Sequence, residues 1–184
     1  TLTSTGEFTV NDPSGNDEQT SGPVRGAERA VDIASNGDYV VVWTDETTGD
    51  KVFAKGLDKD GNAKVAQFQV NTGGVNNQWA DVAVDDSGNF VVTWTRSSDV
   101  YMRRFLANGT AVDGADVPVN TTTSNTQQNS SVNMNDTGDF VIAWEGNGGA
   151  NEGIFVQQGS FGGGLIGSDI AVDTAAAAQD PSVG

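Results

Sequence analysis

Histidine and cysteine are both missing from the 184 residues of this chain. Serine–histidine–aspartate triads, cysteine–histidine pairs and zinc sites of the usual type each need one of these residue types. Catalysis here would therefore have to rest on carboxylates, lysine, tyrosine or a hard metal ion. We accordingly expect a protein that is not an enzyme.

Basic residues are scarce, with nine Lys and Arg against 25 Asp and Glu and a formal net charge of −16. So few cations leave little with which to neutralise phosphates, which argues against a nucleic-acid partner. An acidic surface also repels anionic membranes and attracts divalent cations. No apolar run reaches the roughly 20 residues that a helix needs to cross a bilayer, so we do not expect a membrane-spanning protein.

Helical periodicity is lacking as well, since only the alanine run 175–178 has residue types that favour a helix. The chain instead has 24 glycines and many short segments in which apolar and polar residues alternate. That combination is typical of β-strands joined by tight turns. We predict an all-β fold.

One ten-residue pattern occurs three times, at 34–43, 85–94 and 135–144. Each copy begins with a polar turn that contains glycine and continues as a strand ending in tryptophan. Each strand is apolar on both faces and must be covered on both. We therefore predict stacked hairpins with a repeated core, and its tryptophans stand 51 and 50 residues apart at Trp43, Trp94 and Trp144.

Other elements recur with the same period. A short strand ending in Asn or Asp occurs at 67–71, 116–120 and 169–173, and Pro118 predicts an edge strand because proline cannot donate to a ladder. With the hairpin and a third strand, each period holds about four antiparallel strands, the content of a propeller blade.

A glutamine stands four residues before a repeated apolar position three times, at Gln78, Gln128 and Gln179. The first copy has Ala27 at that spacing, so the sequence predicts that this repeat lacks the glutamine.

The repeats predict one domain over residues 1–184, with repeat 1 at about 6–66, repeat 2 at 67–115, repeat 3 at 116–168 and the start of a fourth at 169–184. Three blades do not close a propeller, which typically has four to eight. Either the chain belongs to a longer one, or subunits complete each other by adding strands across an interface. A β-trefoil is the alternative fold.

These elements together resemble the tandem repeats of large secreted bacterial surface proteins. The resemblance rests on strands ending in Val-Asn, a glutamine-containing loop, hairpins such as 88–94 and turns such as Asn108-Gly109, and it covers about residues 6–184. Such repeats are similar to propeller blades and are often found beside calcium-binding glycine-rich repeats. The resemblance implies an extracellular or cell-surface protein.

Candidate ligand chemistry lies in few places. Asp58 and Asp60 stand like the first ligands of a calcium loop but lack its terminal glutamate, so a solvated hairpin turn is the alternative. Calcium is the one cofactor considered. Trp79 lies outside the repeated register and is the candidate for stacking on a ligand. Arg103 and Arg104 could bind an anion, but Arg103 aligns with Lys55 and is expected to face water.

The sequence therefore favours a non-enzymatic structural or assembly module that polymerises through its terminal strands into a filament or surface layer. Its partners would be itself or other copies of the repeat. A lectin-like adhesin that binds glycans is the alternative, and a propeller glycosidase is the third reading. Acidic pairs such as Asp85 and Asp86 fit hairpin turns better than a pair of catalytic carboxylates across a cleft.

Overall fold

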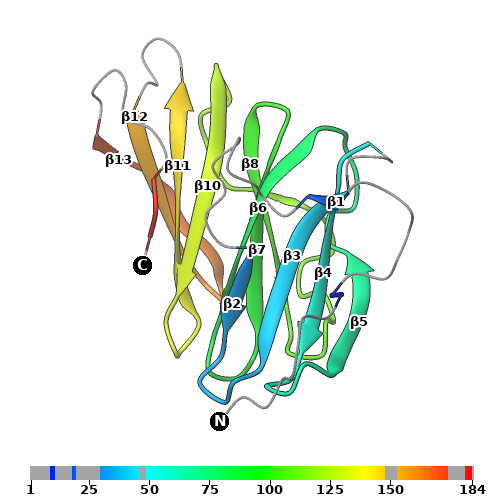
Figure 1. Ribbon diagram of the computed structural model, residues 1–184. Helices are drawn as coiled ribbons and strands as arrows, with labels where there is room; N and C mark the ends of the chain where they lie inside the picture. The colour runs from blue at the N-terminus through cyan, green and yellow to red at the C-terminus, as the bar shows by residue number, and fades with distance from the viewer. Residues whose placement is uncertain are drawn as a thin grey trace.

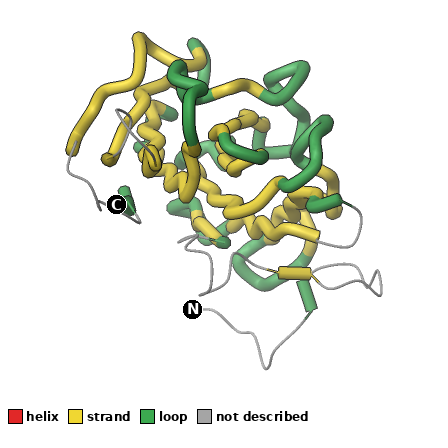
Figure 2. Tube along the Cα trace, turned by 90° about the horizontal axis from the view of Figure 1, so that it is seen from above, coloured by secondary structure: helices red, strands yellow, loops and turns green. Residues whose placement is uncertain are grey.

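The computed structural model describes residues 9–10, 18–19, 30–45, 49–147, 153–173 and 181–183. The described elements are strands, loops and turns, with no helix among them (Figures 1 and 2). The strands are β1 (Glu18–Gln19), β2 (Val31–Ile33), β3 (Tyr39–Asp45), β4 (Lys51–Leu57), β5 (Ala63–Gln69), β6 (Asn77–Val84), β7 (Phe90–Arg96), β8 (Asp99–Phe105), β9 (Val117–Pro118), β10 (Thr126–Met134), β11 (Asp139–Asn147), β12 (Gly153–Ser160) and β13 (Gly164–Asp173). The alanine run 175–178 lies outside the described residues.

These strands form three antiparallel sheets in chain order (Figure 1). The second sheet has the order β6-β7-β8-β9 and the third β10-β11-β12-β13. In the first sheet, β1 and β2 both pair with β3 and share one edge, followed by β4 and β5. The all-β architecture of three four-stranded, blade-like sheets is thus as predicted, and the described strands form no closed barrel of the trefoil kind.

Local sequence rules explain the hairpins. Gly37, Gly88 and Gly138 have φ angles of 90°, 81° and 89°, the left-handed region that glycine enters without a Cβ clash. Each amide donates back to the residue three positions earlier, as Gly88 does to Asp85 at 2.9 Å. Pro118 lies in the edge strand β9, where its missing N–H leaves no ladder bond unmade, as predicted.

Each tryptophan of the repeat pairs across to an aromatic residue on the next strand. The ring centroids are 6.0 Å apart for Trp43 and Phe53, and Trp94 on Tyr101 and Trp144 on Phe155 follow at 6.3 and 6.2 Å. All three ring pairs are nearly parallel, within 20°. The tryptophans therefore occupy the same place in their respective sheets, and all three are buried.

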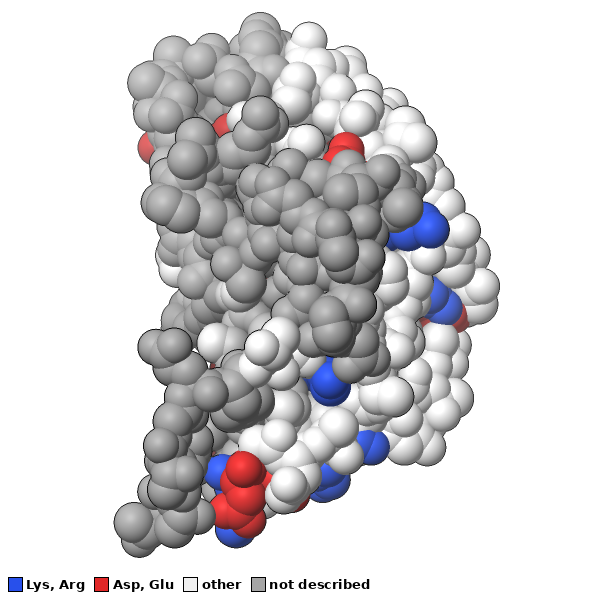
Figure 3. All heavy atoms as spheres, turned by 45° about the vertical axis from the view of Figure 1, so that its right-hand side comes forward, with Lys and Arg blue, Asp and Glu red and all other residues white. Residues whose placement is uncertain are grey.

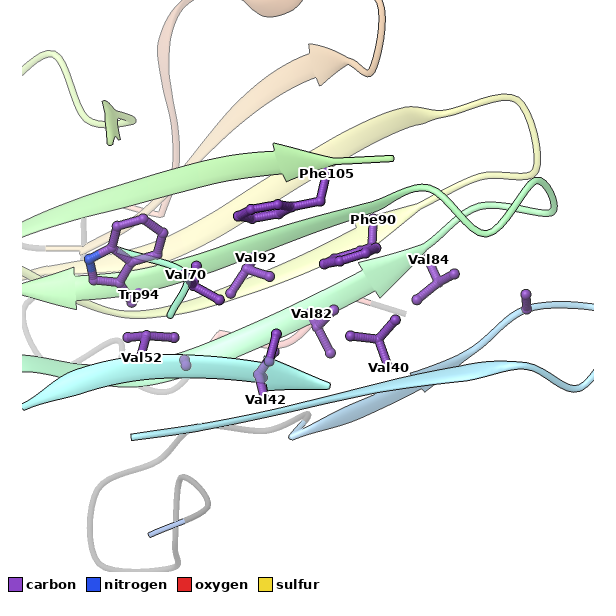
Figure 4. Packing of buried hydrophobic residues seen from close by; sticks show 13 residues of the cluster. Val40, Val42, Val52, Val70, Val82, Val84, Phe90, Val92, Trp94 and Phe105 are labelled. Atoms are coloured by element: carbon purple, nitrogen blue, oxygen red, sulfur yellow. The ribbon is translucent and has the colours of Figure 1, made fainter. Parts of the chain in front are cut away.

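Two buried cores hold the three sheets together. In the first, Val40, Val42 and Val52 of the first sheet face Val82, Val92 and Trp94 of the second (Figure 4). In the second, Ala83, Val91 and Val100 of the second sheet pack on Val132, Ile142 and Trp144 of the third. The second sheet is thus covered on both faces, as its two-sided apolar strand β7 requires.

The register corrects the prediction that the first repeat lacks its glutamine. Gln19 lies opposite Thr44, as Gln78 lies opposite Thr95 and Gln128 opposite Glu145. The counterpart is therefore Gln19 and not Ala27. Sequence spacing failed here because more residues separate β1 from β2 than lie in the bulges of β6 and β10.

Candidate association surfaces

Each sheet has two faces of different composition. We call the side that carries Trp43, Trp94 or Trp144 the tryptophan face, and the opposite side, which carries Val52 or Val100, the valine face. The valine face of the first sheet packs on the tryptophan face of the second, and the valine face of the second packs on the tryptophan face of the third. Two faces consequently remain at the ends of the stack: the tryptophan face of the first sheet and the valine face of the third.

The first of these end faces is exposed at its β2 edge, at apolar residues that are buried in the other sheets, whereas Trp43 on the same face is buried. Val31 is 50% exposed, whereas its register counterparts Val82 and Val132 are 0% exposed. Ile33, which lies next along the same face, is 57% exposed. Burying a valine or isoleucine side chain contributes about 1.5–3 kcal/mol, so this face favours association with an apolar partner.

The valine face of the third sheet shows the same contrast. Val172 is 63% exposed, while Val70 and Val119, which precede the chain's two described Val-Asn bends, are 0% and 1% exposed. Ile166 and Ile170 on β13 are exposed as well. A groove of about 760 Å³ lies over this face, between residues that include Val141 and Ile166.

Hydrogen bonds repeat from one sheet to the next. The carboxylate of Asp81 in the second sheet accepts the amide of Val132 in the third at 2.8 Å. Ser131, which occupies the place of Asp81 one sheet further on, accepts the amide of Val183 at 3.5 Å. The same step therefore leads from the second sheet to the third and from the third to residues 181–183.

A second repeated bond ties the loops between sheets. Asp116 accepts the amide and hydroxyl of Thr72, at 2.8 and 2.9 Å, and Asp169 accepts the amide of Thr121 at 2.9 Å. Asp116 also pairs with Arg96 at 2.6 Å. These two aspartates therefore hold loops of neighbouring sheets together.

The Val-Asn bends have a structural role. Asn71 accepts the amide of Val52 at 2.9 Å, and Asn120 accepts that of Val100 at 2.7 Å. Both asparagines are buried. Their amide groups close the end of each sheet, which explains an asparagine at this point of the repeat.

The predicted calcium ligands serve the β4–β5 turn. Asp58 Oδ1 accepts the amides of Asp60 and Asn62 at 2.9 and 2.8 Å, and Asn62 Nδ2 donates to Oδ2 at 3.0 Å. These bonds, the side chain of Asn62 first, lower the pKa of Asp58. Asp60 pairs with Lys59 at 2.6 Å, which raises the pKa of that lysine.

No group of three or more potential metal ligands among His, Cys, Asp and Glu occurs within the described part of the chain. Asp85 holds its own turn in the same way as Asp58, accepting the amides of Ser87 and Asn89. The structure therefore brings Asp58 and Asp60 together in a hairpin turn, and among the described residues no third Asp or Glu joins them in a group that could hold a metal ion. The calcium site stays a prediction.

Trp79 lies at the bulge of β6, in a left-handed conformation with φ of 54°. Asn129 occupies the corresponding bulge of β10 with φ of 53°. The indole of Trp79 is half-buried, and its Nε1 is buried without a hydrogen-bond partner. Its place in a repeated bulge gives Trp79 a conformational role, and the stacking of a ligand on it remains untested.

The two arginines do not form an anion site. Arg103 is buried, contrary to the expectation that it faces water, and donates to the carbonyls of Val70 at 2.5 Å and Asp113 at 2.8 Å. Arg104 forms a bidentate pair with Asp113 and donates to Phe161 O at 2.6 Å. Alignment with Lys55 could not reveal this, because each arginine also has a partner from a neighbouring sheet, Val70 at the end of the first for Arg103 and Phe161 in the third for Arg104.

On the face turned forward in Figure 3, Lys and Arg side chains are spread singly over the described surface, and acidic atoms gather beside basic ones at its lower end. A small pocket of about 80 Å³ lies between the hairpin ends of the first and second sheets, lined by residues that include Asp38, Lys64 and Ser87. Asp38 and Lys64 form an ion pair there. The pocket's charges are thus already paired.

Comparison with protein-family models and with curated protein sequences found no match. Within the described residues, no helix is long and apolar enough to cross a membrane. The repeated sheets and their two end faces are therefore the features on which a function can be argued.

Proposed function

We propose that this chain is a non-enzymatic, extracellular structural module that assembles with other sheets of the same repeat pattern. The observation that supports this most directly is the exposure of Val31 and Ile33 on the first sheet, at positions that stacking buries in the other two. The tryptophan faces of the second and third sheets are each covered by a valine face. The tryptophan face of the first sheet, exposed at its β2 edge, therefore fits a valine face as its partner.

The two end faces are of opposite kinds, so association is head to tail. A tryptophan face has a valine face as its partner in both internal interfaces, and the stack ends in one face of each kind. Such a heterologous contact generates a ring if the rotation closes and a filament if it does not. This polarity is the physical basis of the assembly role.

Sedimentation velocity over a range of protein concentrations tests the proposal. The chain is expected to associate, and Ile33→Asp to weaken that association at least tenfold, because a carboxylate on this face would be desolvated without a partner. Val112→Asp is the matched control, since Val112 is 42% exposed and lies outside both end faces. A chain that stays monomeric at every concentration, or equal loss in both variants, would refute the assembly role.

A further inference from the structure

Residues 181–183 are placed relative to the third sheet as the first strand of one sheet is placed relative to the sheet before it. Residues 181–183 lie against β10, and the amide of Val183 donates to Ser131 Oγ at 3.5 Å. In the preceding step, the amide of Val132 donates to Asp81 Oδ2 at 2.8 Å. Ser131 is the counterpart of Asp81 one repeat later, and Val183 is the counterpart of Val132. Val183 therefore has the same position relative to the third sheet as Val132 has relative to the second.

The sequence before Val183 supports this equivalence. Gln179 precedes Val183 by four residues, as Gln78 precedes Val82 and Gln128 precedes Val132. Val82 and Val132 both belong to the first strand of a sheet, β6 and β10. Val183 therefore corresponds to a position inside the first strand of a further sheet, past the start of that strand.

The space beside Val183 is a groove of mixed lining, in which apolar side chains stand beside those of Asn133, Asn135 and Asp139. The groove of about 760 Å³ is lined by Val183 together with Val141, Gln158 and Ile166 of the third sheet. Val172, on the same face, is 63% exposed. In the other two sheets the valine face is covered by the next sheet's Phe90, Val92 and Trp94 or Phe140, Ile142 and Trp144.

We propose that residues 181–183 belong to the first strand of a fourth four-stranded sheet, and that the remaining three strands of this sheet cover the valine face of the third sheet. The occupant carries an aromatic residue, a β-branched residue and a tryptophan at alternate positions of its second strand and turns them toward β12 and β13. This inference rests on the proposed function, in which a tryptophan face packs on a valine face. A fourth sheet would cover the valine face of the third sheet, and its own valine face would then end the stack.

The test extends the chain with its own repeat. Residues 84–120 are appended directly after Gly184, since Gly184 occupies the place of Ala83 after Val82. The matched control has the same extension with serine at the counterparts of Phe90, Val92 and Trp94. Amide hydrogen exchange of β12 and β13 and binding of an apolar dye are measured on the parent chain and both extensions.

The extended chain is expected to slow exchange in β13 at least tenfold and to lose dye binding, while the serine extension behaves like the parent. Equal exchange in all three, or protection that appears on β2 and β3 instead, would overturn the proposal. Measurements at a dilution where the parent is monomeric separate the two ideas. Protection that appears only in oligomers would mean that a second copy covers the valine face of the third sheet, and it would refute the fourth sheet. If the parent chain does not associate, the proposed function fails but this test still applies.

A second variant checks the place of residues 181–183 in the parent chain. Ser131→Ala removes the acceptor of the Val183 amide, and we expect faster exchange of residues 181–183 with unchanged exchange in β7 and β8. Unchanged exchange at Val183 in this variant would also count against the proposal.

Discussion

The amide oxygen of Gln127 accepts a hydrogen bond from the indole N–H of Trp144 at 3.1 Å. Asn77 occupies the same register position in the second sheet. It lies opposite Arg96, two residues after Trp94, as Gln127 lies opposite Gly146, two residues after Trp144. The asparagine side chain is one methylene shorter, and both Asn77 Oδ1 and Trp94 Nε1 are buried without a hydrogen-bond partner. A buried polar atom without a partner costs about 1–3 kcal/mol.

Asn77→Gln is therefore expected to stabilise the protein by about 1 kcal/mol, because the longer side chain can reach the indole of Trp94. Urea denaturation monitored by tryptophan fluorescence measures the change. The reverse substitution, Gln127→Asn, is the matched control and should destabilise by a similar amount. If Asn77→Gln lowers stability, a longer side chain at position 77 does not form with Trp94 the hydrogen bond that Gln127 forms with Trp144.

Asp81 links two sheets from a fully buried position. Its carboxylate accepts the amides of Val82 at 2.9 Å and Val132 at 2.8 Å. Asp81→Ala should lower the free energy of unfolding by about 2–3 kcal/mol, since buried donors lose their acceptor. Ser131→Ala, at the equivalent place with one bond of 3.5 Å, should cost less. Equal losses in the two variants would show that the sheet-to-sheet bond at Asp81 adds nothing.

The repeated hairpins could be predicted from sequence because their causes are local. Gly88 permits the turn, the run of aromatic and β-branched residues at 90–94 favours a strand, and Pro118 can lie only at an edge. The burial of Arg103 could not be predicted, because one of its acceptors, the carbonyl of Val70, directly follows β5 of the first sheet and approaches only when the sheets stack.

Arg104 joins the second sheet to the third through its bonds to Asp113 and to the carbonyl of Phe161. Arg104→Ala should destabilise by about 3 kcal/mol, because it leaves the carboxylate of Asp113 buried and unpaired. Adding Asp113→Ala should recover part of that loss, so a double-mutant cycle by chemical denaturation should give a coupling of about 1–3 kcal/mol. Strictly additive losses would mean that the pair contributes no mutual stabilisation.

The pKa of Asp58 is lowered first by the side-chain amide of Asn62 and then by backbone amides of the turn. A lowered pKa in the folded protein stabilises it above the ordinary aspartate pKa, and that stabilisation is lost as the pH falls through the lowered value. Asn62→Ala should move the pKa of Asp58 up, as measured by NMR titration of its carboxyl carbon. Lys59→Ala is the control and should move it less, since Lys59 is the smallest of the causes. A larger shift in the control would assign the effect to charge.

Calcium binding at the same turn has a clear thermal test. Calcium takes six to eight oxygen ligands, and both oxygens of Asp58 already accept hydrogen bonds from Asn62, while Asp60 is paired with Lys59. We therefore expect the same Tm in millimolar calcium and in chelator, for the parent chain and for Asp60→Asn alike. A Tm that rises with calcium in the parent, and fails to rise in Asp58→Asn and Asp60→Asn, would show that the metal displaces these donors and would establish the turn as a calcium site.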